Sequence, residues 1–163
     1  MPYRKFLKSF YIYNFLLIFL FSVSINSLNA FYLINIISFV LFHFVIIYLS
    51  LYYYRKIIYL IFFIFGLGFD IFLINQIGPH LIVFLLSLFL LSLTKRLYQN
   101  LDSIKIYFLI FSTIAMMLFL EMFLTKLFFG YNMNIDNYLK LIMISIIVSF
   151  PVFFIFSKID RFN

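Results

Sequence analysis

Residues 65–80 of the chain read FGLGFDIFLINQIGPH, and this stretch decides how the sequence can fold. It places a single acidic residue, Asp70, inside a run of Phe, Ile and Leu that is long enough to lie in a membrane. A carboxylate at that depth costs on the order of 3 kcal/mol on insertion scales, so other parts of the fold must supply partners for it. Gly66 precedes Asp70 by one helical turn and is expected on the same helix face.

The composition around this stretch is that of an integral membrane protein. The chain of 163 residues is 67% hydrophobic and only 10% charged, with a mean hydropathy of +1.18, which leaves too little polar surface for a soluble domain. Cysteine is absent, which excludes disulfides, thiolate metal sites and cysteine nucleophiles. The basic residues that give the net charge of +7 lie at the ends of the apolar runs. This pattern indicates how the spans are oriented in the membrane, and it does not indicate a nucleic acid partner.

The apolar runs predict an all-α membrane protein, a compact bundle of about six transmembrane helices. Each run is about as long as a helix needs to cross a hydrocarbon core roughly 30 Å thick. No linker separates the runs, so residues 1–163 are expected to form a single integral-membrane domain. The expected spans are 10–25, 31–51, 57–74, 79–94, 104–129 and 138–157.

The basic residues predict the orientation of the bundle. Ten of the twelve fall before the first span, after the last one, or in alternate connections, and the positive-inside rule makes that side cytoplasmic. We therefore expect both termini in the cytoplasm and the turns at 26–30, 75–79 and 130–137 outside. The ten residues are Arg4, Lys5, Lys8, Arg55, Lys56, Lys95, Arg96, Lys105, Lys158 and Arg161.

The candidate site residues begin with the hairpin between the third and fourth spans. Gly66 is expected to let a neighbouring backbone approach, and Asp70 then either pins the hairpin through hydrogen bonds or forms a ligand or proton site. The structural role is favoured, because no second carboxylate or cation is adjacent. Gly78 and Pro79 suit a tight turn and a first helical turn, and His80 is expected within reach of Asp70.

Glu121 is a second buried acid, in the fifth span. Thr125 lies on its helix face and Lys126 is close enough to be a partial partner, so an interhelical bond is favoured over a translocation site. His43, in the second span, has the same two alternatives, and the structural one is favoured more strongly. The sequence contains no zinc-binding spacing and no hydrolase motif, so we predict a protein that is not an enzyme and has no metal or cofactor.

The 65–80 segment resembles the MreD family of bacterial rod shape-determining membrane proteins. That family shows a Gly-x-x-x-Asp step at the end of a span, a short turn with Ile/Leu-Gly, and a new span. The matching positions here are Gly66, Asp70, Ile77 and Gly78, followed by Lys95-Arg96 at the end of the next span. The size, the span count, the basic N-terminus and the short basic tail also fit this family.

This resemblance implies a non-enzymatic component of the cell-wall elongation complex in the bacterial inner membrane, with a role in cell shape. The implied partners are an MreC-like protein, the actin-like MreB, a RodA-type glycosyltransferase and a class B penicillin-binding protein, besides the lipid bilayer. The resemblance also implies a fold shared with the substrate-binding components of energy-coupling-factor vitamin transporters.

Such a substrate-binding component is the alternative function. Those proteins typically use small-xxx-small alanine motifs on the first span to dock their partner, because close helix approach needs small residues. The first span here has no alanine, and the whole chain contains only Ala30 and Ala115. A third alternative, a small pore, would need a polar helix face along a lumen, and no span shows one.

Overall fold

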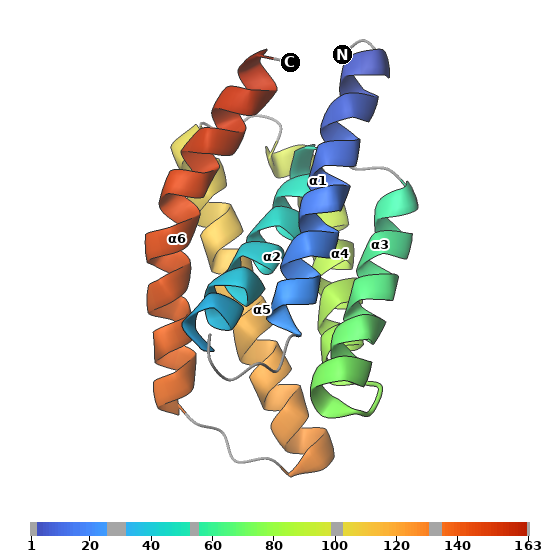
Figure 1. Ribbon diagram of the computed structural model, residues 1–163, viewed down its shortest axis with the longest axis vertical. Coiled ribbons are helices and arrows are strands. Elements are labelled where there is room, and N and C mark those ends of the chain that lie inside the picture. The colour runs from blue at the N-terminus through green and yellow to red at the C-terminus, as the bar shows by residue number, and fades with distance from the viewer. Residues whose placement is uncertain (1–2, 26–31, 53–55, 99–102, 131–134, 163) are drawn as a thin grey trace.

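The computed structural model describes residues 3–25, 32–52, 56–98, 103–130 and 135–162, and in these ranges the chain is helical apart from short turns (Figure 1). Six α-helices and one π-helical turn, η2, follow one another along the chain. They are α1 (Tyr3–Ser24), α2 (Tyr32–Tyr52), α3 (Lys56–Phe69), η2 (Asp70–Ile74), α4 (Pro79–Tyr98), α5 (Ser103–Phe129) and α6 (Ile135–Phe162).

The helices form an antiparallel bundle in which both ends of the chain lie at the same end (Figure 1). The starts of α1, α3 and α5 and the ends of α4 and α6 meet there, at the top of the view. The opposite end is formed by η2 together with the end of α5 and the starts of α2 and α6. This arrangement agrees with the alternation of basic residues, which marks the same helix ends.

Helix α2 is the centre of the bundle. It contacts α1, α4, α5 and α6, and every side chain from Phe42 to Ser50 is buried. The neighbouring helices bury one face each, for example through Leu17 of α1, Phe62 of α3 and Phe84 of α4. Their opposite faces expose large apolar side chains such as Phe15 and Ile147, at 74% and 72%. An apolar outer face is what a helix needs when its solvent is lipid.

The expected helical bundle is confirmed at the level of its helices. Four of the described helical segments are long and apolar enough to cross a membrane: Leu33–Tyr52, Lys56–Ile74, Ile104–Phe129 and Tyr138–Phe156. The apolar parts of α1 and α4 are shorter, Tyr11–Ser24 and Pro79–Leu93. Of the turns expected outside, 26–30 and residues 131–134 of 130–137 lie outside the described residues.

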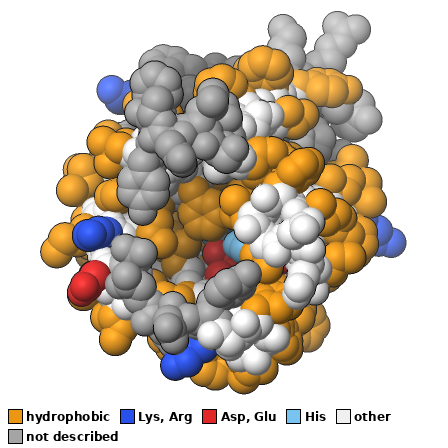
Figure 2. All heavy atoms as spheres, turned by 60° about the horizontal axis from the view of Figure 1, so that its bottom comes forward, with side chains coloured by type: hydrophobic (Ala, Val, Ile, Leu, Met, Phe, Trp, Pro, Cys, Tyr) orange, Lys and Arg blue, Asp and Glu red, His pale blue; other side chains and the backbone are white. Residues whose placement is uncertain are grey.

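The end of the bundle formed by η2 is hollowed at its centre. Figure 2 shows this end with a largely hydrophobic surface, in which an acidic side chain (red) and a histidine (pale blue) are visible at the floor of the hollow. An acidic side chain and a histidine of the bundle interior are therefore partly open to this end, although the interior polar side chains are largely buried.

Candidate functional site

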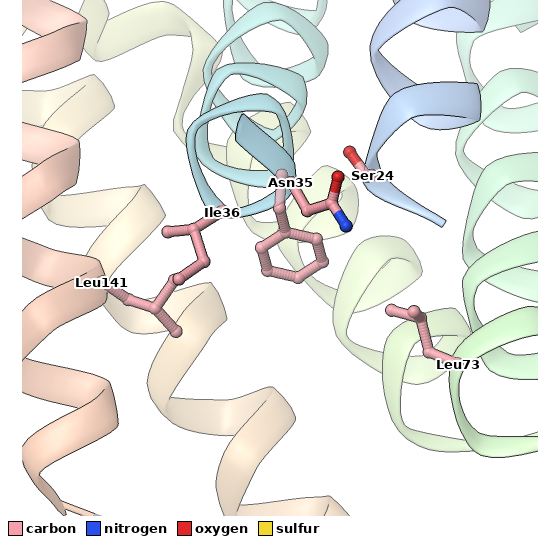
Figure 3. A pocket seen from close by; sticks show the side chains of 6 residues that line it. Ser24, Asn35, Ile36, Leu73 and Leu141 are labelled. Atoms are coloured by element: carbon pink, nitrogen blue, oxygen red, sulfur yellow. The ribbon is translucent and has the colours of Figure 1, made fainter. Parts of the chain in front are cut away.

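A cavity of about 230 Å³ opens at the hollow end, between α1, α2, η2 and α6 (Figure 3). Its lining is mostly apolar, with one polar side chain from α1 and one from α2. Phe39 forms the wall between this cavity and the two histidines, because its ring also contacts those of His43 (centroids 4.4 Å apart) and His80 (6.3 Å). The lining residues are Ser24, Asn35, Ile36, Phe39, Leu73 and Leu141.

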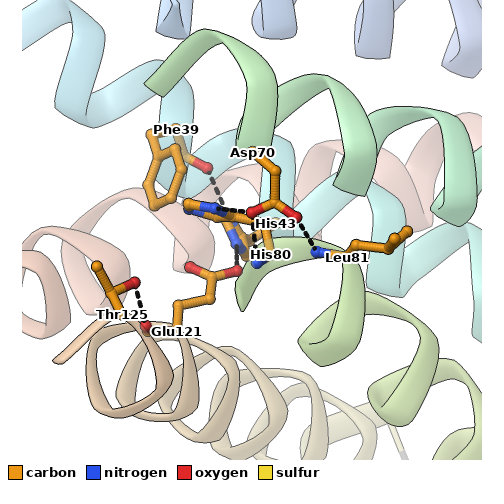
Figure 4. Close-up of polar contacts among 7 residues, drawn as sticks. All are labelled: Phe39, His43, Asp70, His80, Leu81, Glu121 and Thr125. Carbon is orange, nitrogen blue, oxygen red and sulfur yellow. Dashed lines mark hydrogen bonds and ion pairs between the residues drawn. The ribbon is translucent and has the colours of Figure 1, made fainter. Parts of the chain in front are cut away.

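Asp70 is fully buried in η2, and its carboxylate binds the first turn of α4. Oδ2 accepts hydrogen bonds from the backbone N–H groups of Gly78 (2.8 Å) and Leu81 (3.0 Å). Oδ1 accepts hydrogen bonds from the backbone N–H (2.9 Å) and the ring Nδ1 (3.0 Å) of His80. Figure 4 shows the bonds to His80 and Leu81. A carboxylate that accepts these bonds satisfies the free N–H groups at the start of a helix, where the helix dipole also favours negative charge.

The local sequence explains why α4 begins at this carboxylate. Pro79 is the first residue of α4, where its missing N–H leaves no donor unpaired. Asn75 ends η2 in the left-handed region, with φ of 59°, and thereby reverses the chain. The wider π-type turn at Asp70–Ile74 directs the carboxylate across to α4 instead of along α3.

Gly66 brings the backbones of α3 and α4 together one turn before Asp70. A Cβ added at Gly66 would lie 2.9 Å from the Cα of Leu81 and 3.4 Å from the carbonyl oxygen of His80, so any side chain would push the helices apart. Gly68 faces a different helix, because a Cβ there would meet the ring of Phe21 in α1 at 2.7 Å. The expected close approach at Gly66 is thus present, and it sets the distance over which Asp70 reaches its donors.

His43 of α2 and Glu121 of α5 form a second buried pair. His43 Nε2 lies 2.9 Å from Glu121 Oε1, and the two side chains are 0% and 6% exposed. The other ring nitrogen, Nδ1, lies 2.8 Å from the carbonyl oxygen of Phe39 (Figure 4). The pair joins two helices through residues 78 positions apart, in the middle of an otherwise apolar layer.

The two histidine–carboxylate pairs share their aromatic surroundings. The ring of Phe69 lies between the imidazoles, with centroids 6.3 Å from His43 and 5.8 Å from His80 and interplanar angles of 27° and 31°. Phe84 contacts His43 edge-on at 5.3 Å. The centre therefore holds four ionisable side chains in an apolar shell, which is where electrostatic interactions are least screened.

The structure brings three of the predicted residues, Asp70, Gly78 and His80, together. The contact expected between His80 and Asp70 is confirmed, and the backbone N–H of Gly78 donates to Asp70. The interhelical bond expected at Glu121 is confirmed, but its partner is His43 of α2; the partial partner expected, Lys126, was wrong, because its side chain is exposed. Thr125 donates to the backbone carbonyl of Glu121 and does not reach its carboxylate.

His43 is the site residue whose pairing with Glu121 was not predicted from the sequence. The available signal was its combination with Glu121: the described spans hold only a few ionisable side chains, and in an apolar medium such groups pair with each other. Within the described residues, no group of three or more His, Cys, Asp or Glu side chains is arranged to hold a metal ion.

Comparison with protein-family models, with curated proteins and with solved structures finds no match to this chain.

Proposed function

We propose that this chain is a non-enzymatic membrane scaffold of the bacterial cell-wall elongation complex, with a role in cell shape. It would lie in the inner membrane with both termini in the cytoplasm, in contact with an MreC-like protein. MreB, a RodA-type glycosyltransferase and a class B penicillin-binding protein would be further members of the complex.

The observation that carries this proposal is the use of the MreD-like step as one structural unit. Gly66 allows the contact between α3 and α4, Asp70 caps α4, and Gly78 supplies one of the capping N–H groups. The residues of the resemblance are thus explained by a rigid hairpin rather than by a catalytic constellation. A rigid bundle with apolar outer faces is suited to binding other membrane segments.

The exposed faces of α1 and α6 are the surfaces on which partner contact can be tested. A photo-crosslinking residue in place of Phe15 on α1 or Ile147 on α6 would report its neighbour in the membrane, since both side chains are more than 70% exposed. We expect one of these positions to crosslink to the MreC-like protein and the other to lipid. Crosslinking to lipid alone from a series of positions around both helices would contradict the proposal.

Cell shape provides the functional test. Depletion of the protein should make rod-shaped or curved cells round, and the wild-type chain should restore their shape. The protein should also co-purify with the MreC-like protein in mild detergent. Unchanged cell shape together with lost vitamin uptake would overturn the proposal in favour of the alternative.

That alternative, the substrate-binding component of an energy-coupling-factor transporter, is favoured by the cavity at the hollow end. The cavity combines apolar walls with Ser24 and Asn35, as a site for a small vitamin would. Its volume of about 230 Å³ lies below the range of roughly 300–1,000 Å³ that is usual for small-molecule pockets. Helix α1 also contains no alanine with which to dock a transporter partner.

A further inference from the structure

Two polar atoms of the buried centre have no partner in the described part of the chain. They are Oε2 of Glu121 and Nε2 of His80, whose side chains use only Oε1 and Nδ1 for their hydrogen bonds to other side chains. Among the described residues, the one enclosed side-chain polar atom without a partner is Oγ of Ser87, so neither of these two atoms is enclosed. Glu121 and His80 keep 5% and 7% exposure, whereas His43 and Asp70 have none.

The hydrogen bonds of His43 fix the number of protons on its pair with Glu121. Nδ1 faces the carbonyl oxygen of Phe39, which can only accept, so Nδ1 carries a hydrogen. The 2.9 Å contact between Nε2 and Oε1 then requires one more proton, on either atom. The pair is therefore neutral overall, as imidazolium with carboxylate or as imidazole with carboxylic acid.

Loss of that proton would change the contact between α2 and α5. A lone pair on Nε2 of His43 would then face a carboxylate oxygen of Glu121 without a hydrogen between them, and a net negative charge would be buried in an apolar shell. The two atoms would have to separate. The observed distance is thus that of the proton-loaded pair.

Asp70 differs from Glu121 in this respect. Both of its oxygens already accept two N–H bonds each, and three of the four come from backbone groups at the start of α4: Gly78, just before the helix, and His80 and Leu81 within it. A proton on either oxygen would displace a donor that has no other partner. Asp70 therefore remains a carboxylate and holds His80 with a hydrogen on Nδ1.

We propose that Glu121 and His43 form a proton-binding site that is reached from the hollow end of the bundle. One proton is held between the two side chains, and it enters from water and leaves to water through Oε2 of Glu121, which is not enclosed. Binding of this proton raises the charge of the site by one. The proton forms one N–H or O–H bond, and no covalent bond of the protein breaks. Occupancy of the site governs the contact between α2 and α5, a property independent of the scaffold role.

The ionisable groups that face this site come from each element packed around it. Asp70 faces it from η2, His43 from α2, His80 from α4 and Glu121 from α5. Lys126 of α5 is exposed and makes no contact with the site.

Carbodiimide labelling of the wild-type protein tests the proposal without a variant. Dicyclohexylcarbodiimide enters apolar regions, and a protonated carboxyl adds across its C=N bond to give an O-acylisourea that mass spectrometry can locate. We expect labelling at Glu121 and no labelling at Asp70, whose two oxygens are both occupied by N–H donors and which serves as the internal control. Equal labelling of the two acids would overturn the proposal, and so would an unlabelled Glu121 together with a His43 Nε2 that carries no shared proton in the NMR measurement below.

Nitrogen NMR of the two histidines provides the second measurement. In the wild-type protein Nε2 of His43 should give the signal of a nitrogen that shares a proton, and Glu121→Gln should shift it towards that of a neutral imidazole nitrogen. Asp136→Asn, which removes an exposed acid from α6, should leave it unchanged. A wild-type signal typical of a free imidazole nitrogen would refute the shared proton.

Discussion

Substitution of Gly66 by alanine tests whether the contact between α3 and α4 holds the hairpin together. The new Cβ would lie 2.9 Å from the Cα of Leu81, and this neighbour is backbone that cannot rotate away. Ordinary contact begins near 3.4 Å, so the helices must separate by about 0.5 Å. The three backbone hydrogen bonds of Asp70, now 2.8–3.0 Å long, cross the same gap and would lengthen with it.

We expect Gly66→Ala to destabilise the protein by about 1–3 kcal/mol, which is typical of overpacking in a close-packed interior. Gly78→Ala is the matched control from the same hairpin. A Cβ at Gly78 would meet only the side chains of Phe128, at 3.6 Å, and Phe129, at 4.0 Å, which are ordinary contact distances, and the N–H that Asp70 binds is retained. The expected loss there is below about 0.5 kcal/mol, as for substitutions that disturb no contact.

The assay is thermal denaturation of the purified protein in mild detergent. The measured quantity is the fraction of the protein that remains monodisperse in size-exclusion chromatography after heating. Gly66→Ala should lower the midpoint clearly, and Gly78→Ala should leave it near that of the wild type. Equal effects of the two substitutions would refute the reasoning, because the MreD-like step contains both glycines and only the structure separates their roles.

Further predictions concern the buried acids and the orientation. Asp70→Ala should lower membrane abundance more than Asp70→Asn, which keeps one of two acceptor oxygens; equal abundance of both variants and the wild type would contradict the capping role. His43→Ala should destabilise the protein by about 1–3 kcal/mol in the same denaturation assay, because Glu121 loses its partner, and Glu121→Gln should cost less. A cysteine at Asn75 should react with an impermeant thiol reagent in intact cells and one at Lys158 should not, since these exposed residues lie at opposite ends of the bundle; the reverse labelling would overturn the orientation.

The hairpin could be predicted from the sequence because its contacts are local. Asp70 and its donors are separated by eight to eleven residues, and a turn with Gly78 and Pro79 restricts where those donors can lie. Helical periodicity placed Gly66 on the face of Asp70. The apolar runs likewise predicted the helices. In a chain this hydrophobic, runs of this length fit few structures other than membrane-spanning helices.

The pair of His43 and Glu121 could not be predicted in the same way. Its residues lie on helices that are not consecutive, and their contact depends on which faces of α2 and α5 meet inside the bundle. All the spans are apolar on every face, so hydrophobic periodicity does not show which face is buried. Lys126 was chosen as a partner because it is near in sequence, but the long basic side chain reaches the surface instead.

The cap that Asp70 places on α4 also has a consequence for membrane insertion during synthesis. When α3 and η2 leave the ribosome, the carboxylate of Asp70 has no partner. Its backbone donors at 78, 80 and 81 follow eight to eleven residues later. At a synthesis rate of about 5–20 residues per second, these donors emerge within roughly two seconds. The unpaired acid disfavours release of α3 into lipid by itself, so α3 and α4 should leave the insertion machinery together, as a closed hairpin.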